Sequence, residues 1–321
     1  MRLVTMHHEF GTRELSDLCV RHSLRGRLDF DVGMAKKTSL KVGGAARVSF
    51  TPLNCPDLSD FLRASEPFNL PLMFVGLGSN LLVRDEGLSG ITVFTHKALS
   101  ELELQLDGQD SVIYAEAGVA APKLARFSAL HHFEGAEFLA GIPGTVGGAL
   151  AMNAGCYGSE TWDHVLKVKT IDKFGNLKIR EKSEFFISYR EVISKYDQSE
   201  YFVGGWFRFR RGSGDRSREK IKNLLARRVS EQPLDKPNCG SVFRNPPGYY
   251  AAQLIENCDL KGKTIGGAMI SPKHANFIVN TGGASARDVE LLMREVQSVV
   301  AERMGVDLHP EVKILGAKQS G

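Results

Sequence analysis

The feature that most constrains the fold is a glycine-rich, apolar stretch in the middle of the chain. Residues 141–158 read GIPGTVGGALAMNAGCYG, with five glycines before Cys156 and with polar Thr145 and Asn153 among them. Glycine has no Cβ, so a ligand can approach its backbone closely, and exposed N–H groups can bind a phosphate or a planar heterocycle. A tight turn packed between two elements is the alternative, but this density of glycine favours a buried cradle for a cofactor.

Length and charge narrow the classes of protein that fit. The 321 residues suffice for two or three domains, and 42% hydrophobic with 24% charged residues is typical of a soluble globular protein. The net charge of +4, from 41 basic and 37 acidic residues, is too balanced to favour a nucleic-acid partner. It is compatible with a small anionic ligand.

The cysteines and the N-terminus indicate the compartment. Five widely spaced cysteines without a C-x-x-C pair argue against a disulfide framework and a zinc site. The first ten residues lack the apolar run of a signal peptide, and no window reaches the ~20 apolar residues of a membrane helix. We therefore expect a cytoplasmic protein without a metal site and without membrane association.

A second glycine loop lies earlier in the chain. Leu72–Val75 is a short apolar run, and GLGSN at 76–80 leads into a second strand-like run that begins at Leu81. The dinucleotide fingerprint requires a third glycine where Leu81 stands and a helix after it, so this motif is excluded. The loop is interpreted as an anion nest between two strands, in which Ser79 and Asn80 add hydrogen bonds to a pyrophosphate. An ordinary Gly-Ser-Asn turn fits equally well.

Hydrophobic periodicity predicts an α+β chain. The predicted strands include two that are broken at the glycines of 38–50, and those at 72–75, 91–95, 112–117, 165–172, 177–180, 201–209 and 308–316. Residues 173–176 predict the turn of a β-hairpin.

The sequence predicts helices as well as strands. A short helix near residues 13–22 precedes a connector, and others cover 56–64, 122–130, 216–230 and the segment after Ser285. Leu130 and Val229 are expected on the buried faces of their helices. Ser285 and Asp288 are spaced as an N-terminal capping box, and residues 211–215 are interpreted as a linker.

Candidate chemical groups lie far apart in the sequence. Arg190 suits bidentate binding of a substrate carboxylate, or a surface ion pair. Ser241 lacks the G-x-S-x-G elbow of a hydrolase nucleophile, so it is a proton donor or a turn residue. Glu311 is a general acid or a paired residue at a sheet edge. Patterns of residues alone therefore indicate a cofactor-binding α+β protein, with an enzyme as the favoured class.

The motifs occur in an order that resembles one family. The chain resembles the UDP-N-acetylenolpyruvoylglucosamine reductase (MurB) family of bacterial peptidoglycan synthesis, of the type with a shorter substrate loop. The segments that carry the resemblance are Thr38–Gly44, Gly76–Asp85, Gly141–Gly158, Tyr189-Arg190, Gln232–Leu234, Gly240–Pro246, Leu260–Ala268, Lys273–Asn280 and Pro310–Val312.

The resemblance implies an FAD-binding domain of the vanillyl-alcohol-oxidase (PCMH) type at 36–210 and a C-terminal α+β substrate-binding domain at 211–321. Residues 1–35 form an N-terminal segment that no motif covers. The residues implied to hold FAD are Gly76, Leu77, Gly78, Ser79, Asn80, Leu81, Gly141, Ile142, Pro143, Gly144, Thr145, Gly147 and Gly148.

The implied activity is reduction of the enolpyruvyl ether of a UDP-sugar by NADPH, giving UDP-N-acetylmuramate. A hydride passes from NADPH to FAD, and then from flavin N5 to the vinyl methylene carbon of the sugar nucleotide. Arg190 and Glu311 are implied to stabilise the enolate-like charge, for which Glu311 must carry or share a proton. Ser241 is implied to protonate the α-carbon.

Further residues are implied near the substrate. They are Tyr189, Asn245 and His274, with a lysine from the pair Lys261 and Lys263. In the shorter-loop type the tyrosine that clamps the substrate is absent, so Tyr249 and Tyr250 are the local aromatic candidates.

Two other functions compete with this one. They are an FAD-linked oxidase of the same fold and a non-enzymatic binder of nucleotide sugars. The sequence leaves the oligomeric state open.

Overall fold

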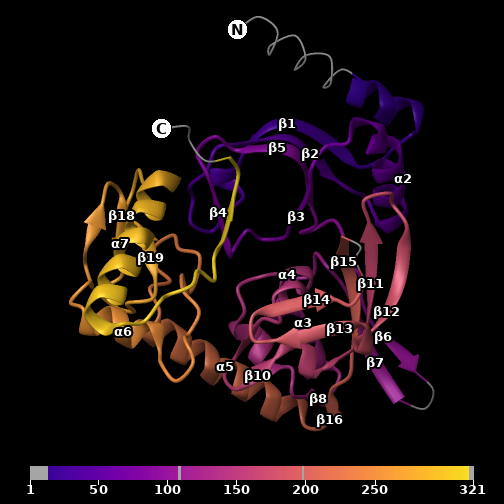
Figure 1. Cartoon of the computed structure of the whole chain (residues 1–321). Helices are drawn as coiled ribbons and strands as arrows, with labels where there is room; N and C mark the ends of the chain where they lie inside the picture. Colours follow the sequence, from indigo (N-terminus) through magenta and orange to yellow (C-terminus); the bar gives the residue numbers. More distant parts are fainter. Residues whose placement is uncertain (1–13, 108–109, 197–198, 318–321) are drawn as a thin grey trace, which may run out of the picture. The chain divides into compact units, whose positions relative to one another are not determined.

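Two compact units share the chain, and their segments alternate along the sequence (Figure 1). The computed structural model describes residues 14–107, 110–196 and 199–317. The first unit contains the described residues through Val32, then Arg47–Gly76 and Ser89–Leu224. The second contains Gly33–Ala46, Leu77–Leu88 and the chain from Leu225 onward. The expected boundary between an FAD-binding domain ending at residue 210 and a substrate-binding domain starting at residue 211 stays a prediction.

One half of the first unit is a four-stranded sheet covered by a helix. Its order is β1-β2-β5-β3, and β3 is parallel to β5. Phe61 of the helix stacks on Phe50 of β2 with ring centroids 3.8 Å apart. The helix begins where Asn54 accepts a hydrogen bond from Asp57 N, with proline in its first turn. The elements are β1 (Arg27–Gly33), β2 (Ala45–Thr51), α2 (Cys55–Ser65), β3 (Leu72–Val75) and β5 (Leu88–Phe94).

The other half contains an antiparallel five-stranded sheet of order β12-β11-β15-β7-β6. The predicted hairpin is confirmed, because β11 and β12 pair in register from Lys167–Glu181 to Ile171–Leu177. Asp172 makes the turn by accepting hydrogen bonds from the backbone N–H groups of Phe174 and Asn176, both at 2.9 Å. The strands are β6 (Leu102–Asp107), β7 (Asp110–Glu116), β11 (Val165–Asp172), β12 (Leu177–Glu181) and β15 (Glu200–Phe207).

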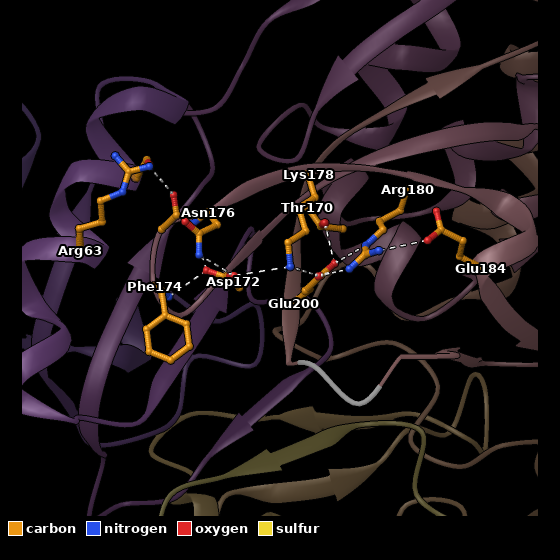
Figure 2. A network of polar contacts seen from close by, with 11 residues as sticks. Arg63, Thr170, Asp172, Phe174, Asn176, Lys178, Arg180, Glu184 and Glu200 are labelled. Atoms are coloured by element: carbon orange, nitrogen blue, oxygen red, sulfur yellow. Dashed lines mark hydrogen bonds and ion pairs between the residues drawn. The ribbon is translucent and has the colours of Figure 1, made fainter.

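An ion-pair network crosses this sheet from β12 to β15 (Figure 2). Glu200, whose side chain is 6% exposed, accepts hydrogen bonds from Arg180 at 2.6 Å, Thr170 at 2.7 Å and Lys178 at 3.2 Å. Burial alone would raise the pKa of Glu200, but these three donors outweigh it and hold the pKa at about 2. The network therefore stabilises the folded sheet only while Glu200 is ionised.

Replacing Glu200 with glutamine is expected to lower the free energy of unfolding by about 2–3 kcal/mol at neutral pH, because Arg180 loses its buried partner. The folded-state pKa lies below the unfolded value, so the contribution is complete above about pH 5 and disappears as the pH falls toward 2. Denaturation followed at several pH values measures both effects. Glu184→Gln is the control, since that more exposed partner of Arg180 should contribute less than about 1 kcal/mol. Equal losses in the two variants would contradict the assignment.

Shorter elements complete the first unit. A short β-hairpin, β13 with β14, pairs Phe185 with Ser194 and Ser188 with Glu191. The further elements are η2 (Glu66–Phe68), α3 (Ala121–Leu130), β8 (Phe133–Glu134), η3 (Glu137–Gly141), α4 (Val146–Ala151), β9 (Gly155–Cys156), β10 (Ser159–Glu160), η4 (Thr161–Asp163), η5 (Lys182–Glu184), β13 (Phe185–Ser188), β14 (Glu191–Ser194), β16 (Arg210–Arg211) and α5 (Gly214–Glu231), which continues into the second unit.

In the second unit, α7 packs on a three-stranded antiparallel sheet of order β17-β18-β19, and α6 packs against α7. A separate parallel pair joins β4 to β20, with Leu81 opposite Lys313. Leu82, Val242, Ile278 and Leu292 belong to its continuous apolar core. The elements are η1 (Met34–Lys36), β4 (Leu81–Val83), α6 (Ala251–Asn257), β17 (Thr264–Ile265), β18 (Ala268–Ile270), β19 (Ile278–Asn280), α7 (Ala286–Met304) and β20 (Lys313–Leu315).

The N-terminus of α7 is capped twice. The predicted capping box is confirmed, because Ser285 accepts from Asp288 N while Asp288 accepts from Ser285 N. Asp85, just after β4, also accepts hydrogen bonds from the N–H groups of Ala286 at 3.0 Å and Arg287 at 3.1 Å. The β4 segment is thereby attached to α7, which no local sequence pattern indicated.

Several expected elements are wrong. Residues 38–42 form a turn instead of a strand, because Gly43 (φ +117°) lies where an added Cβ would be 2.7 Å from Val83 O. Residues 14–21 are helical as expected (residue 13 lies outside the described residues), but Arg27–Gly33 is strand β1 of the sheet and no connector. Residues 211–215 are no linker, because β16 pairs with β8 and α5 begins at Gly214.

Two core assignments are also wrong. Leu130 is 65% exposed, because α3 buries Leu124, Ala125 and Ala129 and its last residue lies outside that face. Val229 is 61% exposed, because α5 buries only its first half, through Ile221. Among the described residues, no helix has both the length and the apolar character that a membrane span requires.

Candidate active site

The glycine-rich stretch of the first unit is a short helix between two irregular segments. It begins where η3 ends at Gly141, and Thr145 is the N-cap of the six-residue helix α4. The N–H groups of Val146 and Gly147 donate to Val119 O at 2.8 Å and Ala117 O at 2.9 Å. The expected loop is therefore partly helical, and part of its backbone donates to the protein itself.

Two adjacent glycines of α4 have different surroundings. An added Cβ at Gly147 would lie 2.8 Å from the Cβ of Ala117, so close packing excludes a side chain there. At Gly148 the nearest atom to an added Cβ is Thr145 Oγ1 at 3.9 Å, so the protein leaves that space open. A glycine inside a helix costs about 1 kcal/mol relative to alanine. Packing does not explain Gly148, whereas close approach of a ligand to the backbone does.

Gly76 lies against the same segment. An added Cβ would be 2.2 Å from Oγ1 of Thr145, which is 2% exposed. The end of β3 and the start of α4 therefore touch through a glycine. Together with the open face at Gly148, this arrangement fits a planar group held by backbone atoms, as FAD requires.

Replacing Gly148 with leucine is expected to weaken FAD binding at least ~10-fold, because the side chain fills the open space. The flavin-free protein should unfold at an unchanged or higher temperature, since leucine favours a helix. Flavin absorbance per polypeptide and thermal unfolding measure the two effects. Gly147→Ala is the comparison for stability: its methyl meets Ala117, so this variant should lower the unfolding temperature of the flavin-free protein. Unchanged FAD affinity of the Gly148 variant would contradict this assignment.

Arg190 lies at the tip of the β13–β14 hairpin and contacts the end of the glycine-rich stretch. Its backbone has φ +59°, and its guanidinium donates to Gly155 O at 2.9 Å and Asn153 O at 3.5 Å. The ring of Tyr189 lies beside the guanidinium, at 4.9 Å. The first unit thus brings Tyr189 and Arg190 to the segment predicted to line the flavin.

Asn153 holds this hairpin in place. It is 1% exposed, and its side-chain amide donates to Ser188 O at 3.1 Å and to Glu160 at 2.7 Å. Its side-chain oxygen accepts from the N–H of Trp162 at 3.1 Å. The sequence marked Asn153 only as a polar residue within the cradle, and the long-range contact to Ser188 was not predictable from it.

The second glycine loop belongs to the second unit from Leu77 onward. Gly78 (φ +62°) is required by packing, because an added Cβ would lie 2.2 Å from Lys37 O. Among the described residues, the N–H groups of Leu77, Gly78 and Ser79 donate to no protein acceptor. Three adjacent free N–H donors on a strand–loop–strand turn are suited to a pyrophosphate.

The side chain of Asn80 is used differently from the expectation. Its Nδ2 donates to Glu311 O at 3.1 Å, and its backbone oxygen accepts from Lys313 N at 3.0 Å. The loop predicted to bind pyrophosphate is thereby joined to the segment that carries Glu311. This contact follows from the parallel pairing of β4 with β20, which puts Leu81 opposite Lys313.

Ser241 and Glu311 lie on neighbouring extended segments. The N–H of Glu311 donates to Val242 O at 2.8 Å, and Phe243 forms an isolated β-bridge with Pro310. Both candidate side chains are half-buried. Ser241 follows Gly240, whose φ of +78° sets the sharp turn before it. The second unit therefore brings together two candidate groups that are far apart in sequence.

His274 is held as a neutral imidazole. Burial lowers its pKa, and the nearby charge of Lys261 lowers it further. Its Nδ1 accepts from Asn276 N at 3.3 Å, so the proton of the neutral ring is on Nε2. His274 can thus present one N–H donor to a ligand.

The remaining candidates have structural partners. The side-chain oxygen of Asn245 accepts from Ala251 N at 3.0 Å, at the start of α6. Lys261 pairs with Glu256, and Lys263 pairs with Glu295. Tyr249 and Tyr250 are 54% and 74% exposed. Asn245 therefore helps to form the start of α6, and each of the two lysines forms an ion pair within the protein.

Family models match both halves of the chain. The model described as "FAD binding domain" matches residues 46–179, and "UDP-N-acetylenolpyruvoylglucosamine reductase, C-terminal domain" matches residues 232–315. A curated UDP-N-acetylenolpyruvoylglucosamine reductase of Thiobacillus denitrificans is 50% identical over 306 residues, covering 92% of this chain and 94% of that protein.

Solved structures agree with this similarity. The crystal structure of UDP-N-acetylenolpyruvylglucosamine reductase (MurB) from Thermus caldophilus matches with a TM-score of 0.74 at 28% identity, covering 91% of this chain and 99% of that one. 6-Hydroxy-D-nicotine oxidase from Arthrobacter nicotinovorans matches with a TM-score of 0.52 at 13% identity, covering 89% and 87%. The second likeness concerns the fold alone, which is of the vanillyl-alcohol-oxidase (PCMH) type.

Proposed function

We propose a mechanism from the premise that this chain belongs to the UDP-N-acetylenolpyruvoylglucosamine reductase family, as 50% identity over 306 residues shows. The protein is an FAD-dependent oxidoreductase of peptidoglycan precursor synthesis. It reduces UDP-N-acetylenolpyruvoylglucosamine to UDP-N-acetylmuramate with NADPH as the reductant. We infer that the reaction takes place in the cytoplasm. Residues 36–210 act as the FAD-binding domain and 211–321 as the substrate-binding domain, an assignment that the two family matches support.

FAD is held by the backbone of two glycine segments. Gly76 and the open face at Gly148 support the assignment in the first unit, and the free N–H groups of Leu77, Gly78 and Ser79 support it in the second. When bound, FAD supplies hydride transfer from NADPH to the substrate double bond. The residues proposed to line it are Gly76–Leu81, Gly141–Thr145, Gly147 and Gly148.

Arg190, together with a Glu311 that carries or shares a proton, stabilises the negative charge that develops on the enolpyruvyl group. Addition of a hydride to the methylene carbon leaves an enolate-like charge next to the substrate carboxylate. A planar guanidinium suits that carboxylate because it donates two parallel hydrogen bonds. Its contacts with Gly155 O and Asn153 O hold the guanidinium in one orientation before the substrate binds.

Ser241 donates the proton that completes the reduction. Its hydroxyl forms no hydrogen bond with the described part of the chain, so it is available to the substrate. The proton goes to the α-carbon, and the serine oxygen is later reprotonated from water. Tyr189, Asn245 and the Nε2–H of His274 bind the sugar nucleotide.

An anaerobic mixing experiment tests this function. Protein reduced with NADPH should be reoxidised promptly by UDP-N-acetylenolpyruvoylglucosamine when oxygen is absent, seen as recovery of flavin absorbance. Reoxidation by oxygen alone would indicate an oxidase. Protein that takes up no FAD would contradict both flavin functions and leave a nucleotide-sugar binder.

A further inference from the structure

We propose that Asn276 is a positioning residue that holds Ser241 at the correct distance from Glu311 and from the substrate. This inference rests on the proposed function, since it gives Asn276 a role through the proton donor. Asn276 lies between His274 and β19, inside the Lys273–Asn280 motif, but the sequence assigned it no role. Asn276 is 4% exposed, so it affects the reaction through the residues that it contacts.

The side chain of Asn276 makes the hydrogen bonds that a neighbouring strand would otherwise make with the segment after Ser241. Its oxygen accepts from Phe243 N at 2.9 Å, and its nitrogen donates to Phe243 O at 2.8 Å. Its backbone oxygen accepts from Val242 N at 2.9 Å. Three hydrogen bonds from one residue thus fix both residues that follow Ser241. An amide is required, because one side chain must accept and donate at the same time.

The same segment carries the contact to Glu311. Val242 O accepts from Glu311 N at 2.8 Å and from Val312 N at 3.4 Å. The peptide groups of Val242 therefore connect Asn276 on one side with Glu311 on the other. A shift of Val242 moves Ser241, its direct neighbour, relative to Glu311. Displacements of about 1 Å can slow an enzymatic step ~10²-fold.

Asn276 also sets the tautomer of His274. Its N–H donates to Nδ1 of His274 at 3.3 Å, which leaves the ring proton on Nε2. Asn276 thereby orients both Ser241, the proposed proton donor, and His274, whose Nε2–H is proposed to bind the substrate. Because the contact with His274 uses only the backbone, substitution of the side chain tests the link to Ser241 separately.

Asn276→Asp is the test variant, because aspartate has nearly the same shape but no N–H. A carboxylate oxygen would then face Phe243 O, and the segment would move away. We expect reoxidation of the reduced flavin by the sugar nucleotide to slow ~10–100-fold, with flavin reduction by NADPH within about twofold. The loss should appear in kcat more than in KM. Asn276→Ser, which is smaller and uncharged, provides the same comparison if the aspartate variant does not fold.

Asn280→Asp is the matched control. Asn280 is also buried, at 8% exposed, and its side chain donates to Leu40 O at 3.2 Å and accepts from Gly282 N at 2.9 Å. Its bonds do not reach Ser241. We expect a comparable loss of thermal stability with the sugar half-reaction within about threefold of the parent. Equal slowing of that half-reaction by the two variants would overturn the proposal.

A double-mutant cycle separates this proposal from the function on which it rests. In a Ser241→Ala background, Asn276→Asp should slow the sugar half-reaction less than twofold, because the group that it positions is gone. A full further 10–100-fold loss would show that Asn276 acts elsewhere. If Ser241→Ala itself leaves the half-reaction unchanged, the role of Ser241 fails instead.

Discussion

Replacing Ser241 with alanine is expected to slow reduction of the sugar nucleotide by ~10²–10⁴-fold, the usual contribution of a general acid. The proton must reach the α-carbon from a group held close to it, and water entering the site is a poorer donor. Flavin reduction by NADPH involves no such proton and should stay within about twofold. Stopped-flow absorbance at the flavin band measures the two half-reactions separately.

Ser39→Ala is the control for this variant. Its hydroxyl donates to Asn238 O at 2.6 Å, so it supports the loop before Ser241 without belonging to the proposed chemistry. We expect less than about threefold change in either half-reaction. Equal losses in the two half-reactions of Ser241→Ala would show that the serine supports the site as a whole and donates no proton.

Replacing Arg190 with lysine is expected to slow the sugar half-reaction ~10²–10³-fold, as loss of a preorganised donor does. Lysine keeps the charge, but its single ammonium cannot contact Gly155 O and also bind a carboxylate through two parallel bonds. The left-handed backbone at Arg190 is unchanged by this substitution. The ratio kcat/KM for the sugar nucleotide and the rates of both half-reactions are the measurements.

Arg180→Lys is the matched control for Arg190→Lys. Arg180 binds Glu200 and Glu184 within the ion-pair network of the same unit, so its substitution should lower thermal stability with little change in turnover (Figure 2). If Arg190→Lys instead lowers FAD content or slows flavin reduction equally, Arg190 serves to hold the 153–155 segment. The proposed charge stabilisation would then be wrong.

Elements with a local signal were predicted well from the sequence. The β11–β12 hairpin follows from alternation on both sides of a Gly-Asn turn, and the start of α7 follows from the spacing of Ser285 and Asp288. In each case the residues that decide the structure lie within a few positions of one another. The break between β3 and β4 was equally predictable from the sequence, because glycines separate two apolar runs.

Elements whose conformation depends on distant packing were predicted poorly. Residues 38–42 have the composition of a strand, yet Gly43 and Gly44 must lie against the backbone of Val83 and Asp85, and that contact imposes a turn. Val229 fits the apolar stripe of α5, but its side chain is exposed. Periodicity identifies an apolar face and does not say how far along a helix the covering elements extend.

The ordered motifs were enough to identify the family, the use of FAD and the candidate site residues, because motifs specify these without knowledge of the geometry. The three-dimensional structure was needed to distinguish Gly147, which packs against Ala117, from Gly148, which faces open space. It was also needed to show that Asn80 and Val242 hold the backbone around Glu311, and that Asn276 holds Val242. These contacts join backbone N–H and C=O groups, which every residue possesses. Their pairing depends on the path of the chain, so it cannot be predicted from the identity of the side chains.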